Sequence, residues 1–379
     1  MGTPFYFPTR LIFSRDAPSD LIQELGKDPI PQVLLLTDRG ILASGLVEPF
    51  LKKLNGEGIH ATVYSEIPGN PNVQELLPAY EAARQASATH VVALGGGSVI
   101  DVGKGVGILL AHPGFDWEDI QWHRTSLQRP AYPVIAIPTT AGTGSEVTKV
   151  AVIGDHTGFK MGVLHPFVFT RSAIIDGSLA LSLPPRLTAA TGMDALVHAI
   201  EAFTGKRASA TTDVFALAAM RRIVNHLPRA TRDGRDIDSR QAMAEAASWA
   251  GIAFDQSGLG LAHALGGPLT ATYHLHHGLG IAVLLPATLS FNYPAIPADR
   301  WEALRDALGM PGDSQPADLA EWSRAFLKDL GMPTRLSEAG LLKKDIPQIA
   351  EETTRMAMFG NNVRAASVPE LIQLLEANF

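Results

Sequence analysis

Short, uninterrupted apolar runs recur along the first half of the chain. They cover residues 33–37, 61–64, 90–94, 134–137 and 173–175. Runs without polar alternation are typical of strands in a parallel sheet that is covered on both faces. A helical pattern over residues 73–87 separates two of these runs, as a crossover connection requires. The pattern therefore predicts an α/β fold for this half of the chain.

The pattern changes after Leu183-Pro184-Pro185. In residues 186–228 and 239–292, Ala, Leu and Met are frequent, and apolar positions recur three and four residues apart. This spacing indicates amphipathic helices that pack together. The charged stretch 229–239 is expected to be a connecting loop, and shorter helices are expected over 295–379. The second half is therefore predicted to be mostly helical.

Length and composition narrow the possibilities further. The chain has 379 residues, enough for two or three domains, and the change of pattern predicts two, residues 1–180 and 181–379. It contains no cysteine, which excludes disulfides, thiolate zinc sites, iron–sulfur clusters and a cysteine nucleophile. Its formal net charge of −7 argues against non-specific binding to nucleic acid.

The sequence gives no sign of a membrane anchor or an export signal. No uninterrupted apolar run reaches the roughly 18 residues of a membrane-spanning helix. The first ten residues, MGTPFYFPTR, lack the basic region followed by an apolar region that marks a signal peptide. The absence of cysteine fits a reducing compartment. We therefore expect a soluble cytoplasmic protein with no membrane or nucleic-acid partner.

A glycine-rich loop follows the apolar run at 90–94. Gly95, Gly96, Gly97 and Ser98 precede a stretch that is expected to begin a helix. Glycines let the backbone approach a phosphate, and a helix N-terminus offers free N–H groups and a favourable dipole. The G-x-G-x-x-G fingerprint is absent because Ile100 stands where its third glycine would be. The loop therefore indicates a phosphate site, with a plain structural turn as the alternative.

A second loop and an aspartate add to this interpretation. Residues 138–146, PTTAGTGSE, follow another predicted strand and place four hydroxyl groups around two glycines. Such groups at the carboxyl end of a parallel strand suit a diphosphate or a ribose. Asp38 ends the first apolar run, where its carboxylate would bind a ribose and repel a 2′-phosphate. Helix capping is the alternative for both, with Glu146 as the partner in the loop.

The second half carries a pair of potential metal ligands. Asp194 and His198 are four residues apart, so they lie on one face of a predicted helix, and their neighbours are mostly apolar. A carboxylate buried among apolar residues needs a compensating charge, which a divalent metal supplies. This spacing indicates a metal site, whereas a single helical histidine is more often a core residue.

Four of the chain's 12 histidines lie close together downstream, in a glycine-rich stretch of low charge: His263, His274, His276 and His277. One carboxylate and several imidazoles suit Fe²⁺ or Zn²⁺, and the lack of thiolates does not separate the two metals. Spacing alone does not decide which of the last three histidines binds the metal.

These motifs together resemble the iron-containing (group III) alcohol dehydrogenase family. The resemblance runs nearly end to end and is most specific at GGGSVID (95–101), PTTAGTGSEVT (138–148), TGMDALVHAIEA (191–202) and 260–280. It implies a Rossmann-like nucleotide-binding α/β domain and an all-α C-terminal domain for metal and substrate, as in dehydroquinate synthase. It also implies an NAD(P)-dependent oxidoreductase that transfers hydride reversibly between nicotinamide and a small alcohol, diol or hydroxy acid, and a homodimer or larger assembly.

The resemblance also assigns residues. The metal ligands, and with them the catalytic site, would be Asp194, His198, His263 and His277, with Fe²⁺ favoured over Zn²⁺. His277 is preferred because it directly precedes the Gly-Leu-Gly of the motif. The cofactor would be NAD rather than NADP, because members that use NAD carry an acidic residue where Asp38 stands. The cofactor-binding positions would be Asp38, Asn70, Gly96, Gly97, Ser98, Thr139, Thr140, Thr143, Lys160 and Leu179.

The chain departs from the family pattern at one position. Many members carry a further histidine four residues after the third ligand, where this chain has Gly267. A proton relay through that histidine is therefore in doubt, and the neighbouring pocket is expected to be roomier. Three other functions are alternatives: a metal-free reductase of oxo-acids such as maleylacetate, a lyase similar to dehydroquinate synthase, and a non-catalytic nucleotide-binding or metal-sensing module. The set of one Asp and three His argues against the first, and the few basic residues near the histidines argue against the second.

Overall fold

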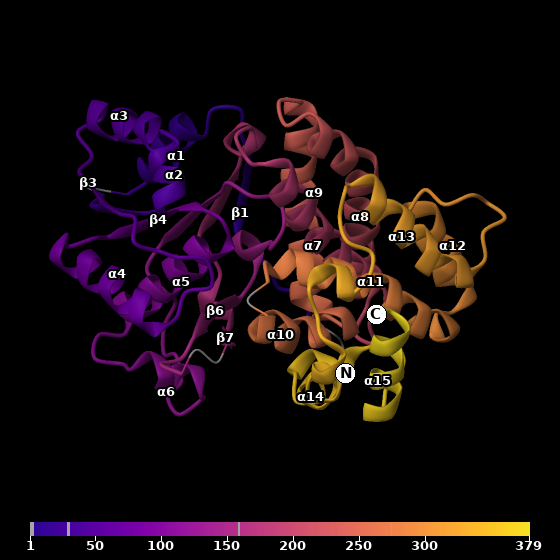
Figure 1. Ribbon diagram of the computed structural model, residues 1–379. Coiled ribbons are helices and arrows are strands. Elements are labelled where there is room, and N and C mark those ends of the chain that lie inside the picture. The colour runs from indigo at the N-terminus through magenta and orange to yellow at the C-terminus, as the bar shows by residue number, and fades with distance from the viewer. Residues whose placement is uncertain (1–3, 29–30, 158–159, 274) are drawn as a thin grey trace. The chain divides into compact units, whose positions relative to one another are not determined.

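The structure is a computed structural model that describes residues 4–28, 31–157, 160–273 and 275–379, without the side chain of Lys160. The chain divides into two compact units. Tyr6–Ser182 forms an α/β unit, and Leu183–Phe379, together with the described residues 4 and 5, forms a helical unit (Figure 1). The α/β architecture of the first half and the helical character of the second half are thus confirmed. The assignment of separate functions to residues 1–180 and 181–379 stays a prediction.

A six-stranded parallel sheet forms the centre of the α/β unit (Figure 1). Its order is β1-β8-β5-β4-β2-β3. The strands are β1 (Arg10–Phe13), β2 (Val33–Leu36), β3 (Ala61–Tyr64), β4 (His90–Gly95), β5 (Val134–Pro138) and β8 (Ser172–Ile175). All five predicted runs form strands of this sheet. The sequence analysis did not predict β1, nor the separate antiparallel pair β6 (Val150–Gly154) and β7 (Lys160–Leu164).

Helices cover both faces of the sheet, as the continuous apolar runs predicted. They are α1 (Ala17–Leu25), α2 (Arg39–Ala43), α3 (Glu48–Gly56), α4 (Val73–Gln85), α5 (Gly97–Ala111) and α6 (Trp117–Gln121). Leu34 and Leu36 of β2 belong to a core that includes residues of α4 and α5. Val33 and Leu35 belong to a second core, with residues of α1 and α3. Because successive side chains of a strand point to opposite faces, one four-residue run supplies both cores.

The order of the strands fixes where a ligand would bind. The chain moves outward from β2 to β3 and then returns inward through β4 to β5, so its direction reverses between β2 and β4. In open α/β sheets, ligands bind outside the carboxyl ends of the strands at such a switch point. Asp38 and the glycine loop directly follow β2 and β4. The topology therefore places both at the expected position.

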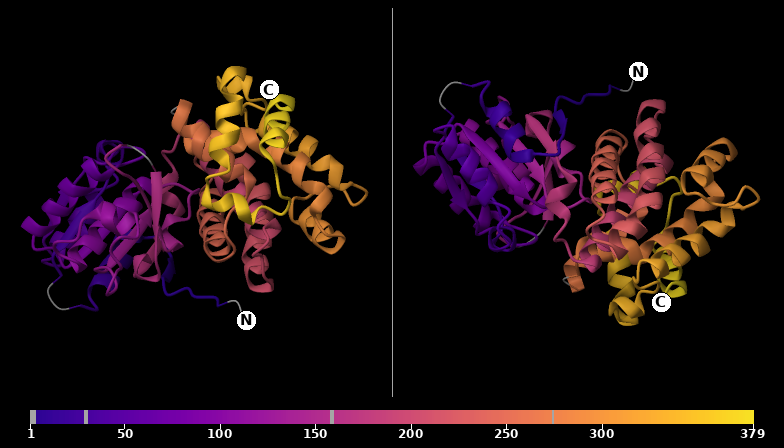
Figure 2. Two further views of the ribbon diagram at one scale, coloured as in Figure 1. Left: turned by 90° about the horizontal axis from the view of Figure 1, so that it is seen from below. Right: turned by 90° about the horizontal axis from the view of Figure 1, so that it is seen from above.

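The described residues of the second unit form helices and loops, with no strand among them (Figure 2). The helix α7 packs against α8, α9 and α11. A separate apolar core joins α10, α11, α14 and α15. The helices are α7 (Pro185–Thr204), α8 (Ala210–Arg232), α9 (Ile237–Ser257), α10 (Leu261–Tyr273), α11 (His277–Asn292), α12 (Ala298–Ala307), α13 (Leu319–Asp329), α14 (Ile346–Thr353) and α15 (Val368–Ala377).

Short 3₁₀ helices punctuate the loops of both units. They are η1 (Ser145–Val147), η2 (Pro166–Val168), η3 (Gly177–Ala180), η4 (Tyr293–Ala295), η5 (Pro316–Asp318), η6 (Ser337–Ala339), η7 (Lys343–Asp345) and η8 (Ala357–Asn361). One apolar stretch, His277–Ala295, is long enough to cross a membrane by composition, but 72% of its most apolar window is buried in the protein. Such burial is typical of a core helix.

The predicted loop at 229–239 is wrong. The helix α8 continues to Arg232 and α9 begins at Ile237, so only four residues connect them. Asp236 is the N-cap of α9 and accepts the backbone N–H of Ser239 at 3.0 Å, and it also pairs with Arg229 at 2.7 Å. The charged residues that suggested a loop therefore cap α9 or lie on the surface of the helices.

Candidate active site

The predicted phosphate loop is the start of α5. Gly96 is its N-cap residue, and no side chain forms a capping hydrogen bond to the first turn. The first N–H groups of an α-helix have no partner within the helix, so this turn suits an anion. The second loop does not begin an α-helix, because only the three-residue helix η1 follows Gly144. Thr143 Oγ1 accepts the N–H of Ser145, the first residue of η1, at 3.2 Å, so a hydroxyl of the loop does cap this turn, and the role of Glu146 as the capping partner stays a prediction.

The two predicted cofactor loops lie side by side. Gly95 of β4 pairs with Pro138 of β5, so both loops leave the sheet at the same edge. A methyl group added to Gly97 would lie 2.7 Å from Thr143 Oγ1, and one added to Gly96 would lie 3.5 Å from Thr140 Oγ1. Glycine is thus required at position 97 for the close approach of the loops.

The other predicted cofactor-binding residues differ in their hydrogen bonds and in their burial. Asn70 has a left-handed backbone, with φ of 59°, and donates its N–H to Ser98 Oγ at 3.2 Å. Asp38 is the N-cap of α2 and accepts the N–H of Ile41 at 2.8 Å, so the capping interpretation holds whether or not it also binds a ribose. Thr139 and Leu179 are buried, with 3% and 7% of their surface exposed.

Two predicted positions fall partly or wholly outside the described residues. Lys160 begins β7, and its side chain is not described. His274, a candidate that the sequence left open, lies outside the described residues.

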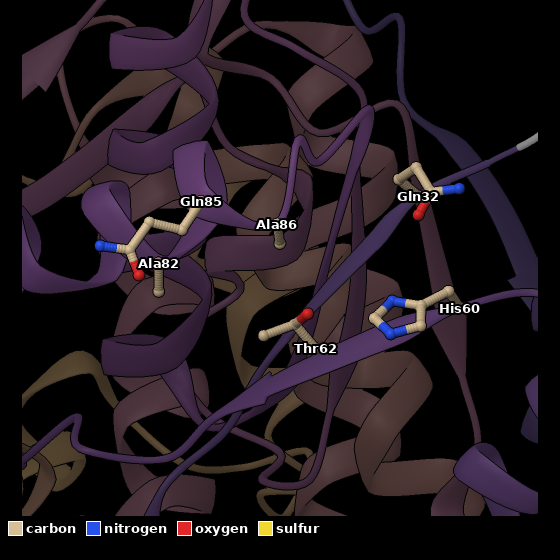
Figure 3. Close-up of a pocket in the computed structure, with 6 residues that line it drawn as sticks. All are labelled: Gln32, His60, Thr62, Ala82, Gln85 and Ala86. Atoms are coloured by element: carbon tan, nitrogen blue, oxygen red, sulfur yellow. The ribbon is translucent and has the colours of Figure 1, made fainter.

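The described pocket in Figure 3 is lined by Gln32, His60, Thr62, Ala82, Gln85 and Ala86. Since Gln32 and His60 directly precede β2 and β3, it opens at the opposite end of the strands from the cofactor loops.

The helical unit brings the four predicted metal ligands together. Asp194 and His198 lie one turn apart on α7, His263 lies in the first turn of α10, and His277 begins α11 (Figure 1). The Oδ1 atom of Asp194 lies 3.5 Å from His263 Nε2 and 3.8 Å from both His198 Nε2 and His277 Nε2. Ligand atoms of Asp194, His263 and His277 all lie within 4.8 Å of one another.

The atoms at the centre of this cluster fit a bound cation. Asp194 and His263 are 2% and 4% exposed, and their Oδ1 and Nε2 atoms are buried without a hydrogen-bond partner among the described residues. Buried polar atoms without a partner are rare and costly in native proteins. His277 closes the cluster with 42% of its side chain exposed, so the site is open on that side. One carboxylate and three imidazoles are suitable donors for Fe²⁺ or Zn²⁺.

Burial and charge shift the pKa values of these groups in opposite directions. Burial would raise the pKa of Asp194, but the neighbouring imidazoles, above all His198, hold it well below its ordinary value. Burial lowers the pKa of His198 to about 4. Burial would also lower the pKa of His263, but the carboxylates of Glu201 and Asp194 outweigh it and raise this pKa to about 9. These two carboxylates therefore favour the protonated form of His263 when no metal is bound.

This protonation predicts that metal affinity depends on pH. A metal binds only the unprotonated nitrogen, so His263 must release one proton on binding. We expect the affinity for Zn²⁺ to rise about tenfold per pH unit between pH 6 and pH 8 and to level off near pH 9, because one proton is displaced below the pKa. Competition with a chromophoric chelator at each pH measures this. An affinity that stays constant over this range would contradict the raised pKa.

The sequence analysis missed two residues beside the cluster. Glu201 lies on α7 and its carboxylate contacts His263 Nδ1 at 2.7 Å. Its position seven residues after Asp194 places it on the face that carries the ligands, which was a usable signal. The contact between Met356 and Gly267 could not be predicted from the sequence, because Met356 lies in a distant part of the chain. A methyl group added to Gly267 would lie 2.7 Å from Met356 Cε, so Met356 occupies space next to Gly267, and the roomier pocket stays a prediction.

Comparisons with known proteins show the family of this chain. Residues 8–177 match the family described as iron-containing alcohol dehydrogenase, and residues 188–379 match the C-terminal part of the Fe-containing alcohol dehydrogenase family. The chain is 33% identical to the NAD-dependent methanol dehydrogenase of Bacillus methanolicus, over 99% of both chains. It is 35% identical to the 4-hydroxybutyrate dehydrogenase of Cupriavidus necator, over 98% of both chains.

A solved structure extends the likeness to the fold. A 1,3-propanediol oxidoreductase is 31% identical, with a TM-score of 0.92 and complete coverage of both chains. Family matches to both units, relatives above 30% identity over nearly the whole length and a shared fold all point to one family. The chain therefore belongs to the iron-containing alcohol dehydrogenase family.

Proposed function

We propose that this chain transfers hydride reversibly between a small primary alcohol and NAD, with a divalent metal held by Asp194, His198, His263 and His277. The observation that carries the proposal is the convergence of three imidazoles, from α7, α10 and α11, on the buried Asp194 Oδ1, which, like His263 Nε2, has no hydrogen-bond partner among the described residues. The same convergence favours a metal-dependent enzyme over a metal-free oxo-acid reductase. Fe²⁺ is the metal we favour, because the family is iron-containing.

The protein's own residues position the reactants. When bound, a divalent metal supplies Lewis-acid catalysis by polarising the oxygen of the alcohol or aldehyde. His277 forms the exposed side of the ligand set, so substrate would enter there. Phe254 stacks on His198 with ring centroids 4.3 Å apart, and Met356 covers Gly267. These apolar groups beside the ligands suit a short carbon chain next to the reacting carbon.

NAD would bind at the carboxyl ends of β2, β4 and β5. The open first turn of α5 would bind the diphosphate, and the hydroxyl groups of Thr139, Thr140 and Thr143 would line the site beside it. Asp38 would bind the ribose. The support is the switch point between β2 and β4 and the close packing of Gly97 on Thr143. Assembly into a homodimer or larger oligomer and a location in the cytoplasm remain predictions from the resemblance and the absence of cysteine.

The decisive experiment joins metal analysis to a substrate screen. Purified protein is expected to contain close to one Fe²⁺ or Zn²⁺ per chain and to reduce NAD with alcohols from a panel that includes methanol, 1,3-propanediol and 4-hydroxybutyrate. Binding of metal and NAD without NAD reduction on any alcohol would overturn the proposal. Consumption of a sugar phosphate with no net change in nicotinamide absorbance would favour the lyase instead.

The role of Asp38 gives a prediction on cofactor choice. Ser is also a good N-cap residue, so Asp38→Ser keeps the cap of α2 but removes the negative charge. We expect the ratio of kcat/KM for NAD to that for NADP to fall by about 10–100-fold, because a hydrogen bond to a charged group is worth about 1.5–3 kcal/mol. Steady-state kinetics with both cofactors measure the ratio.

A matched control separates this effect from helix capping. Asp16 is the N-cap of α1 in the same unit and accepts the N–H of Ser19 at 3.3 Å. Asp16→Ser makes the same chemical change at a helix that carries no predicted cofactor residue, and the ratio should stay constant. An unchanged ratio in Asp38→Ser would show that Asp38 only caps its helix.

A further inference from the structure

Glu201 is a buried carboxylate that the proposed reaction does not use directly. It is 5% exposed and follows Asp194 and His198 along α7 at the i+7 position of their face. A carboxylate removed from water is stable only when its oxygens are hydrogen-bonded. The hydrogen-bond partners of the Glu201 carboxylate therefore indicate its role.

Two of its partners are backbone groups at the start of α10. Glu201 Oε2 accepts the N–H of Gly260 at 2.8 Å, and Oε1 accepts the N–H of Ala262 at 2.6 Å. The N–H of Leu261, which lies between these two residues, donates to Asn362 Oδ1 at 3.2 Å. A negative charge at a helix N-terminus also interacts favourably with the helix dipole. Glu201 thus fixes the end of α10 that carries His263.

Its third partner is the ring of His263. Glu201 Oε2 lies 2.7 Å from Nδ1, and the opposite nitrogen, Nε2, faces Asp194 Oδ1 at 3.5 Å. When Nδ1 donates to a carboxylate, the ring is held in one orientation with Nε2 directed at the metal. Gly260 allows this approach, because a methyl group there would lie 3.2 Å from Glu201 Oε1.

We propose that Glu201 is a positioning residue of the metal site, which fixes both the start of α10 and the ring of His263 so that Nε2 is presented to the metal. One residue of α7 thereby sets the geometry between two ligands on its own helix and a third ligand on another. The inference rests on the proposed function, since it assumes that these residues bind a metal.

The test is the nearly isosteric variant Glu201→Gln. A glutamine amide nitrogen donates where Glu201 accepts. In the place of Oε1 it loses the N–H of Ala262, and in the place of Oε2 it loses the N–H of Gly260 and also faces His263 Nδ1 with a donor. In the second case, the ring places its proton on Nε2 and blocks the metal. We expect affinity for Co²⁺, measured by chelator competition, to fall 10–100-fold, as is typical when the outer partner of a ligand is lost. The visible absorption spectrum of the Co²⁺ form should also change.

Asn362→Ala is the matched control, because it removes a cap from the same helix without touching His263. We expect it to lower the melting temperature of the protein while changing Co²⁺ affinity by less than threefold. Equal losses of Co²⁺ affinity in Asn362→Ala and Glu201→Gln would overturn the proposal, since Glu201 would then act only as a cap. Co²⁺ affinity of Glu201→Gln within twofold of the parent would overturn it as well.

Gly260→Ala provides an independent test that leaves every functional group in place. The added methyl group would lie 3.1 Å from Asn362 Oδ1 and 3.2 Å from Glu201 Oε1, so it would press on both groups that cap α10. Because Asn362→Ala is expected to leave Co²⁺ affinity nearly unchanged, a fall in Co²⁺ affinity in Gly260→Ala would come from the displaced Glu201 carboxylate. Unchanged affinity would contradict the need for this close approach. Failure of the proposed function looks different, because the parent protein would then bind no Co²⁺ at this site, whereas failure of this inference leaves parent and variants binding it equally.

Discussion

Replacement of His263 by Ala is expected to abolish metal retention and turnover while leaving NAD binding largely intact. The imidazole supplies Nε2, which is buried without a hydrogen-bond partner among the described residues, and its loss removes the proposed metal ligand that lies 3.5 Å from Asp194 Oδ1. The loss of metal affinity should exceed the 10–100-fold typical for an outer partner, because a direct ligand is removed. NAD binding should persist because its proposed residues lie in the α/β unit.

Three measurements test this expectation: metal content after dialysis, NAD reduction with the best alcohol of the panel, and NADH binding by fluorescence. His226→Ala is the matched control. His226 is a half-buried histidine of the same unit whose Nδ1 lies 3.3 Å from Ser239 Oγ, outside the cluster. This variant should keep its metal and its turnover. Unchanged turnover in His263→Ala would refute the assignment of the metal site.

The sequence predicted the centre of the sheet better than its borders. Central strands such as β2 and β4 are buried on both faces and so read as continuous apolar runs. The strand β1 has exposed first and last residues, and β6 mixes buried and exposed positions, so neither has such a run. The strand β1 forms by pairing with β8, and β6 forms by pairing with β7. The local sequence pattern does not predict such pairing between distant segments.

Metal-site prediction was limited in the same way. The spacing of Asp194 and His198 is a property of one helix, so the sequence showed it directly. The choice among the downstream histidines depends on how α10 and α11 pack on α7, which a single sequence does not reveal. Only the resemblance separated His277 from His276, and the structure places His277 in the cluster while His276 is exposed. Met356 covers Gly267 through tertiary packing alone.

Gly278→Ala should disturb the metal site without changing any ligand. Gly278 follows His277 in the first turn of α11, and a methyl group there would lie 2.2 Å from the backbone oxygen of Ala190 and 3.4 Å from Asp194 Cβ. Since Ala190 belongs to α7, its backbone oxygen cannot move aside as a side chain would. The start of α11, with His277, must therefore shift away from Asp194. Overpacking of this kind costs about 3 kcal/mol.

We expect Gly278→Ala to lower the free energy of unfolding by about this amount, although alanine favours a helix by about 1 kcal/mol over glycine. Turnover should fall about a hundredfold, because a displacement of about 1 Å at a reacting site has that effect. Urea unfolding and steady-state kinetics measure the two losses. Gly312→Ala is the control, since an added methyl group there meets nothing within 4 Å. Parent-like turnover in Gly278→Ala would show that His277 does not depend on the contact between α11 and α7.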